Sequence, residues 1–257
     1  FRLSISGYSD KLILKGALLF VIYNAGRSRP TKDIDFLGTS ISNDAEEVAK
    51  MIKEILTLDC GDGVAFAPDS VETEDIAEGK MYHGVRIKFL AYIKNIRERI
   101  QLDIGFGDVI ISGPLEMEFP VLLDFPAPKL KVYRVESAIA EKFEAIVSLQ
   151  LMTSRMKDFY DILYFAENFQ FESENLRDAI LSTFHNRNTD IEDRKIIFKE
   201  SFKEDARHQN FWTAFLTRSN LLINQNFSQV IDRIQSFIEP VFTGKKRIWD
   251  PHLFIWK

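Results

Sequence analysis

The sequence predicts an α+β fold in two domains, with a mixed sheet and helices over residues 1–130 and helices alone over residues 131–257. Apolar and polar residues alternate over 85–93 and 100–106, as in strands with one buried face. Throughout the second domain, apolar residues recur at helical spacing instead. Between the two, residues 113–133 hold four of the eight prolines, which is typical of a linker with edge strands.

The first domain begins with an apolar strand, an apolar helix that we expect to end at Gly26, and a strand in which acidic and apolar residues alternate. Asn43, with Glu46 three residues later, predicts a capping box at the start of the next helix. A hairpin connection then joins the two alternating strands. In order, the expected elements are strand 12–14, helix 16–23, strand 33–37, helix 43–58, strands 64–67 and 71–76, strand 85–93, connection 94–98 and strand 100–106.

The second domain is expected to begin with two helices that each carry an apolar stripe. The stripes are Ile139, Phe143, Ile146 and Val147 in one helix, and Met156, Phe159, Tyr160 and Leu163 in the other. Further helices are expected at about 173–185, 190–204, 208–222 and 226–240. The tail, residues 245–257, mixes basic and aromatic residues.

Composition is that of a globular protein, with 257 residues, 46% hydrophobic and 28% charged. A net charge of −5 does not indicate a protein that binds nucleic acid indiscriminately, although it does not exclude a local basic patch. No apolar run reaches the ~18 residues of a membrane span. Cys60 is the single cysteine, so no internal disulfide can form, and we expect a reducing, cytoplasmic location.

A pair of carboxylates marks the candidate site. Asp33 and Asp35 are two residues apart on a predicted strand, so their side chains point to the same face. Two carboxylates this close repel each other unless a cation lies between them. Mg²⁺ suits such a pair, because it takes oxygen ligands and shares its remaining positions with water and substrate phosphates.

Asp103 is the expected third carboxylate. It lies between Leu102 and Ile104 on a predicted strand and so points away from the core. Three carboxylates on neighbouring strands can hold two metal ions. One ion lowers the pKa of an attacking hydroxyl, and the other stabilises the leaving phosphate.

Upstream of the acidic pair, Lys15 and Gly16 lie where a strand turns into a helix, a place where backbone N–H groups can approach a phosphate. Arg29 and Thr31 add donors, whereas Arg27 is expected to be solvated. Each signal alone is weak. Their order, K-G followed by R-x-T-x-D-x-D and then a strand aspartate, is much more specific.

The segments "LILKGALLF", "RSRPTKDIDFLG", "IQLDIGFGD" and "AEKFEAIVSLQLMTSRMKDFYDI" resemble the AbiEii/AbiGii-type nucleotidyltransferase toxins, over roughly residues 1–165. These toxins belong to the DNA polymerase β-like nucleotidyltransferase superfamily. The resemblance implies the toxin of a bacterial toxin–antitoxin system linked to phage defence by abortive infection. It also implies transfer of a nucleotide from an NTP, in some relatives onto the 3′ end of tRNA.

The resemblance assigns roles to individual residues. Gly16 matches the first glycine of a KGG-type loop, and Ala17 stands where the family has a second glycine and the wider superfamily a serine. Backbone N–H groups would therefore have to bind the phosphate without a hydroxyl. The remaining matches are Asp33 and Asp35 with the metal-binding pair, Asp103 with the third carboxylate, and Lys142 and Lys157-Asp158 with two C-terminal motifs.

The spacing of the charged residues in the two helices also allows predictions without the resemblance. Lys142 shares a stripe with small apolar residues, so we expect it half buried and in need of an anion, either a triphosphate or another acid of the protein. Lys157, Asp158 and Asp161 lie opposite the apolar stripe of their helix. They could close a cleft over the nucleotide, help activate the acceptor, or only pair with each other at i,i+3 and i,i+4 spacing.

Taken together, we expect a Mg²⁺-dependent nucleotidyltransferase with its active site between the two domains. Arg29, Thr31 and Lys142 would help Gly16 hold the triphosphate. The expected partners are an NTP, an RNA acceptor such as tRNA and a cognate antitoxin, without a membrane. Two alternatives stay open: nucleotide transfer onto a protein, and an inactive nucleotide-binding regulator, which Ala17 in the phosphate loop would favour.

Overall fold

The computed structural model describes residues 1–23, 29–78 and 82–257, so the predicted helix end at Gly26 and the solvated Arg27 lie outside the described residues. The chain divides into two compact units. One comprises residues 1–108 and 113–133, and the other residues 109–112 and 134–257.

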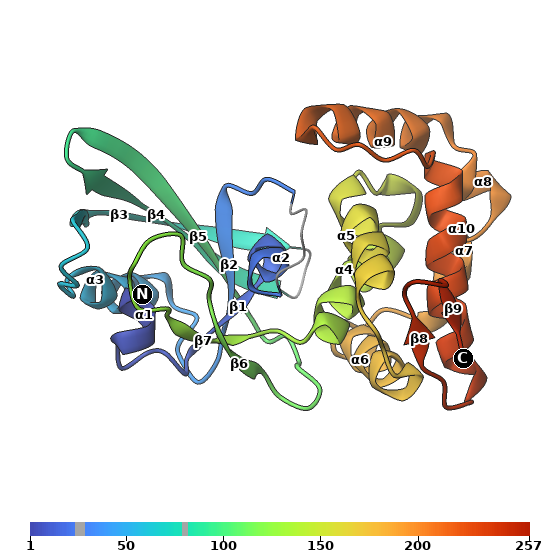
Figure 1. The fold of residues 1–257 in the computed structure, drawn as a ribbon, viewed down its shortest axis with the longest axis horizontal. Helices are drawn as coiled ribbons and strands as arrows, with labels where there is room; N and C mark the ends of the chain where they lie inside the picture. The colour runs from blue at the N-terminus through green and yellow to red at the C-terminus, as the bar shows by residue number, and fades with distance from the viewer. Residues whose placement is uncertain (24–28, 79–81) are drawn as a thin grey trace. The chain divides into compact units, whose positions relative to one another are not determined.

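The first unit is built on a seven-stranded sheet with the strand order β3-β4-β5-β2-β1-β7-β6 (Figure 1). The sheet is mixed, because β1 with β7 and β2 with β5 run parallel while the other neighbours run antiparallel. This confirms the predicted α+β class. The strands are β1 (Leu12–Lys15), β2 (Asp33–Gly38), β3 (Val64–Glu78), β4 (Tyr82–Ile93), β5 (Ile96–Phe106), β6 (Leu115–Glu118) and β7 (Lys129–Val132).

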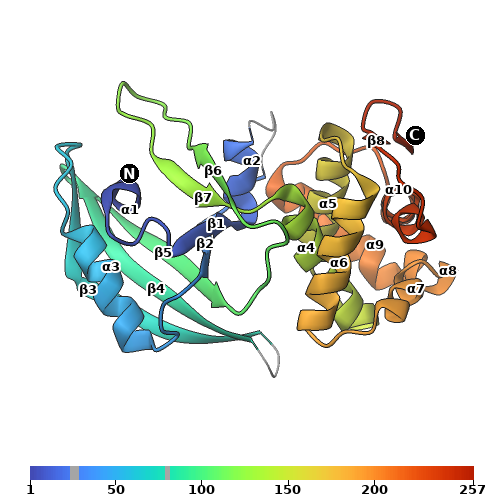
Figure 2. The same ribbon diagram turned by 90° about the horizontal axis from the view of Figure 1, so that it is seen from below.

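One face of the sheet forms the core of this unit, where α3 (Ala45–Leu56) lies along β3 and β4 (Figure 2). Val85, Ile87 and Phe89 alternate along β4 and are buried, and so are Val48 and Ile52 of α3. Since neighbouring residues of a strand point to opposite faces, the residues between these apolar ones are left on the other face. The charged residues of the candidate site lie on that second face.

The start of α3 differs from the prediction. Asp44, rather than Asn43, is the N-cap, and its carboxylate accepts hydrogen bonds from the backbone N–H groups of Glu46 and Glu47 at 2.9 and 3.0 Å. An acidic cap both satisfies these N–H groups and places negative charge at the positive end of the helix. The predicted capping box at Asn43 was therefore wrong, because Asp44 caps the helix with its side chain alone.

Strand β3 is also longer than predicted, because it is a single strand with a bulge between Ala67 and Glu72 instead of two short strands. The bulge contains Pro68, which has no N–H to donate. There, the Ser70 hydroxyl donates to the carbonyl of Ala67 at 2.6 Å and accepts from the N–H of Leu90 at 2.9 Å. These side-chain bonds join β3 to β4 across the interruption.

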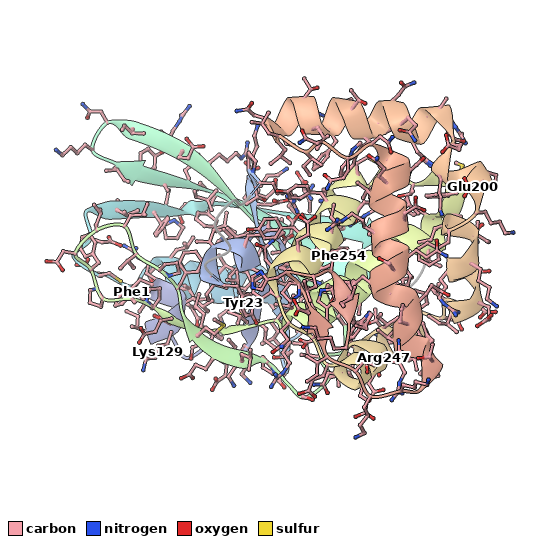
Figure 3. All side chains as sticks on the ribbon, turned by 45° about the vertical axis from the view of Figure 1, so that its right-hand side comes forward. Phe1, Tyr23, Lys129, Glu200, Arg247 and Phe254 are labelled. Carbon is pink, nitrogen blue, oxygen red and sulfur yellow. The ribbon has the colours of Figure 1, made fainter. Side chains whose placement is uncertain are left out.

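Two short helical segments follow β1. They are η1 (Gly16–Leu18) and α2 (Leu19–Ile22), and α2 buries Leu19, Phe20 and Ile22 as the predicted helix required. Tyr23, labelled in Figure 3, follows α2 and donates its hydroxyl to the carbonyl of Tyr133 at 2.8 Å. This bond ties the end of the helix to the end of β7.

The second unit is a helical bundle in which α4 packs against α5 and α6, and α5 packs against α10 (Figure 1). No helix among the described residues is long and apolar enough to cross a membrane. The helices of more than one turn are α4 (Val135–Leu149), α5 (Met156–Asn168), α6 (Ser173–Asn186), α9 (Ala206–Ser219) and α10 (Phe227–Ile238).

The helix predicted at 190–204 is instead three short pieces: η3 (Ile191–Asp193), α7 (Arg194–Ile197) and α8 (Glu200–Lys203). The chain is extended at Lys199, which breaks the helix. After the break, Phe202 is fully buried and the ammonium of Lys203 reaches Asp232 at 2.5 Å. The tertiary contacts of these two side chains thus override the helical pattern of the sequence.

The tail forms a small hairpin of β8 (Trp249–Asp250) and β9 (Ile255–Trp256), which the composition of 245–257 did not predict. Trp249 is buried and donates its indole N–H to the carbonyl of Ala166 at 2.6 Å. Trp256 stacks on Phe237 with ring centroids 5.8 Å apart. The aromatic residues of the tail therefore complete the core of the bundle.

Candidate active site

The strand register places a row of charged residues across the second face of the sheet. Lys15 of β1 is opposite Asp35 of β2, Asp35 is beside Asp103 of β5, and Asp103 is opposite Arg86 of β4. Two carboxylates thus lie at the centre of the row with one cation on each side. The predicted neighbourhood of Asp103 and the acidic pair is present, and it depends on the parallel pairing of β2 with β5.

The three predicted carboxylates come together. Asp33, Asp35 and Asp103 each offer one oxygen, and these oxygens lie within 4.8 Å of one another. All three residues are half buried, so a bound ion would keep access to water and substrate. Three carboxylate oxygens fit Mg²⁺, which takes oxygen ligands and shares its remaining positions with water or substrate.

The backbone of Gly16 packs directly against the side chain of Asp35. Its φ is +70°, and a Cβ atom at this position would lie 1.9 Å from Oδ2 of Asp35. Only glycine can therefore bring the backbone so close to this carboxylate. Ala17 is 3% exposed, so its side chain is packed inside the unit and presents no group to a ligand.

The predicted cation Lys15 is held on the same face. Its ammonium lies 2.8 Å from the carboxylate of Asp108 and 5.4 Å from the ring centroid of Tyr133. Asp108 was not predicted as part of the site, although it ends the quoted segment "IQLDIGFGD".

Asp103 is bonded to two neighbours that the sequence analysis missed. Arg86 donates from Nε to Oδ1 at 2.8 Å and from a terminal nitrogen to Oδ2 at 2.7 Å. The amide of Gln101 donates to the same two oxygens at 3.2 and 3.4 Å. The hydrogen bond to Asp103 raises the pKa of Arg86 above its usual range, and the charge of Asp33 adds to this effect.

The approach to β2 supplies the other two predicted donors. The Thr31 hydroxyl donates to the carboxylate of Asp33 and lies 3.3 Å from the carbonyl oxygen of the same residue. Thr31 therefore orients a carboxylate of the cluster. Arg29 is half buried at the start of this segment.

In the helical unit, Lys142 of α4 contacts two acids of α5. Its ammonium lies 2.7 Å from Asp161 and 3.3 Å from Asp158. Arg155, which the sequence analysis did not single out, reaches Asp158 at 2.5 Å. Asp158 and Asp161 are 1% and 0% exposed, while Lys157 is exposed. The anion that Lys142 needs is thus supplied by two acids of the protein.

The pKa of Asp158 reflects two opposing effects. Burial raises the pKa of this carboxyl, but the charges of Lys142 and Arg155 together lower it more, so its pKa lies below the ordinary value. Asp158 is therefore ionised at neutral pH inside the helical bundle.

The comparison with known families decides the class. The model of the family described as "Nucleotidyl transferase AbiEii toxin, Type IV TA system" matches residues 1–233. The chain belongs to the AbiEii nucleotidyltransferase toxin family. The match extends beyond residue 165, where the recognisable motifs end, and takes in most of the helical unit of this nucleotidyltransferase.

Solved structures give more distant likenesses to this AbiEii protein. JHP933 from Helicobacter pylori is 12% identical with a TM-score of 0.47, covering 93% of this chain and 88% of that one. A putative nucleotidyltransferase from H. pylori is 13% identical with a TM-score of 0.45, covering 93% and 91%. An antigenic nucleotidyltransferase-like protein from Paracoccidioides brasiliensis is 12% identical with a TM-score of 0.40, covering 72% and 84%. No curated protein matches the chain.

Gly16→Ala should disrupt the site through both strain and a clash with Asp35. Gly61→Ala is the matched control, because Gly61 also has a positive φ of +62° but no atom within 4 Å of the added Cβ. In urea denaturation, we expect the control to lose about 1 kcal/mol of unfolding free energy and Gly16→Ala at least about 2–3 kcal/mol. Equal losses would show that the contact between Gly16 and Asp35 does not constrain the turn.

Lys142→Met should strongly destabilise the helical unit, since it leaves buried carboxylates without their ammonium. A loss of about 3–5 kcal/mol is expected for breaking such a buried ion pair. Lys157→Met, on the exposed side of α5, should change stability by less than about 0.5 kcal/mol. Circular dichroism during urea denaturation measures both, and similar midpoints for the two variants would contradict the burial argument.

The lowered pKa of Asp158 predicts acid sensitivity. A carboxyl with a pKa below its unfolded value stabilises the fold fully above the unfolded pKa, and this contribution is lost as the pH falls through the folded pKa. Between about pH 5 and pH 3, the unfolding free energy of the wild type should thus fall more steeply than that of Asp158→Asn. The measurement is urea denaturation at each pH. If the unfolding free energies of the two proteins fall equally steeply with falling pH, the prediction is wrong.

Proposed function

We propose that this AbiEii-type protein transfers a nucleoside monophosphate from an NTP to an acceptor, with Asp33, Asp35 and Asp103 as ligands of Mg²⁺. The observation that carries the proposal is the gathering of three carboxylate oxygens within 4.8 Å beside the turn at Gly16. Such a concentration of negative charge is unfavourable unless a cation binds there.

We assign a role to each candidate-site residue of the first unit. When bound, Mg²⁺ would lower the pKa of the attacking hydroxyl and stabilise charge on the phosphates. Thr31 orients Asp33, and the Gly16 backbone fixes the place of Asp35. The turn from Lys15 to Ala17 offers backbone N–H groups to the triphosphate, and Lys15 and Arg29 supply positive charge on the approach.

In the helical unit, we propose roles for Lys142, Lys157 and Asp158. Lys157 is the exposed cation of the three and the one suited to meet a phosphate directly. Lys142 and Asp158 are joined by their ion pair, so their contribution is to hold α4 and α5 in one arrangement. Asp158 keeps its negative charge at neutral pH because of its lowered pKa.

For the acceptor, we propose an RNA end, in particular the 3′ end of tRNA. The support is the resemblance to toxins whose relatives modify tRNA. Membership in a type IV toxin–antitoxin family further supports a cognate antitoxin as partner. The same carboxylates would also serve transfer onto a protein, so the acceptor has to be read from the labelled product.

The test incubates the protein with bacterial cell extract and each of four α-³²P-labelled NTPs. We expect label in RNA with the wild type, and at least about a 100-fold loss with Asp35→Asn, because a ligand of the catalytic ion is removed. Asp75→Asn is the matched control, because Asp75 is an exposed strand aspartate of the same sheet. It should keep full activity.

Each outcome discriminates between the alternatives. Label in protein instead of RNA would replace the RNA acceptor with a protein acceptor while leaving the reaction in place. Transfer by Asp35→Asn at the wild-type rate would reject the site. Binding of NTP and Mg²⁺ by the wild type without any labelled product would favour the inactive regulator.

A further inference from the structure

Asp103, the third carboxylate of the cluster, is paired with the guanidinium of Arg86. Arg86 donates two hydrogen bonds to Asp103, of 2.8 and 2.7 Å, one to each carboxylate oxygen. This two-pronged geometry is the strongest pairing that arginine and a carboxylate make. Both oxygens that could bind a metal ion are therefore engaged by a guanidinium.

Arg86 also has a second carboxylate on its other side. The strand register places Glu74 of β3 opposite Arg86, just as it places Asp103 of β5 opposite Arg86 from the other direction. Glu74 is 53% exposed and lies 2.6 Å from the ammonium of Lys88. The charge of Arg86 contributes to lowering the pKa of Glu74, although Lys88 has the larger effect. A guanidinium that leaves Asp103 thus has a neighbouring anion to pair with.

We propose that Arg86 is a built-in counter-ion of the metal site: it occupies Asp103 in the metal-free protein, and a divalent ion that binds Asp103 displaces it toward Glu74. This inference rests on the proposed function, because it takes Asp103 as a metal ligand. It adds that metal binding is an exchange of one cation for another. The exchange weakens the affinity for the metal but keeps the metal-free cluster from repelling itself.

The first test measures binding of Mn²⁺, a probe for Mg²⁺, to the full chain without nucleotide by isothermal titration calorimetry. Arg86→Gln should bind Mn²⁺ about tenfold more tightly or better than the wild type, since the competing cation is gone. Lys129→Gln is the control, because Lys129 is an exposed cation of the same sheet that lies near Glu118 instead of Asp103 or Glu74. It should change the affinity by no more than about twofold.

Thermal unfolding gives a second readout that does not depend on activity. In EDTA, Arg86→Gln should melt below the wild type, and added Mn²⁺ should raise its melting temperature by more than it raises that of the wild type. Arg86→Lys keeps the charge but loses the two-pronged bond, so its Mn²⁺ affinity should lie between those of the wild type and Arg86→Gln. This variant carries the test if Arg86→Gln does not fold without metal.

Equal Mn²⁺ affinities for the wild type, Arg86→Gln and Arg86→Lys would overturn the proposal, and so would equal tightening by Arg86→Gln and Lys129→Gln. Asp35→Asn separates this failure from that of the proposed function. If Asp35→Asn binds Mn²⁺ as the wild type does, the metal site itself is rejected and the role of Arg86 falls with it. If Asp35→Asn loses Mn²⁺ while Arg86→Gln matches the wild type, only the exchange is rejected.

Discussion

Repulsion among three carboxylates is the constraint on which the first unit depends. Asp33, Asp35 and Asp103 hold oxygens within 4.8 Å of one another, an arrangement that raises the free energy of the folded chain unless positive charge or hydrogen-bond donors compensate. The surroundings supply both. Arg86 binds Asp103 with two hydrogen bonds, and Thr31 donates to Asp33. The folded chain therefore compensates this cluster with its own donors, and the proposed metal ion would add a further positive charge.

The sheet keeps this charged cluster apart from the apolar core, because the two lie on opposite faces. The apolar residues of β4 and the buried side of α3 form a core on one face, and the charged row lies on the other. Parallel pairing of β2 with β5 then places Asp35 directly beside Asp103, and the pairing of β1 with β2 sets Lys15 opposite Asp35. One face is therefore apolar along β4, while the other carries the charged row of the candidate site next to buried residues such as Ile13 and Leu37.

The helical unit follows a different rule, since it buries its charges inside the bundle. Asp158 and Asp161 are almost inaccessible to water and depend on Lys142 and Arg155 for neutralisation. A buried ion cluster contributes little net stability compared with apolar packing, but it penalises any arrangement in which the partners separate. It thus helps to specify how α4 packs on α5.

Local pattern in the sequence was enough to predict the α+β class, most helices, the alternating strands and the face on which Asp33, Asp35 and Asp103 lie, because side-chain periodicity depends only on neighbours along the chain. It could not predict that Arg86 would meet Asp103, that Asp108 would meet Lys15, or that Lys142 would be held by Asp161. Those pairs join residues far apart in the chain, and only strand register and helix packing decide them. The sequence by itself determined which charges the protein carries and on which face of each element they lie, whereas the tertiary structure decided which charges neutralise one another.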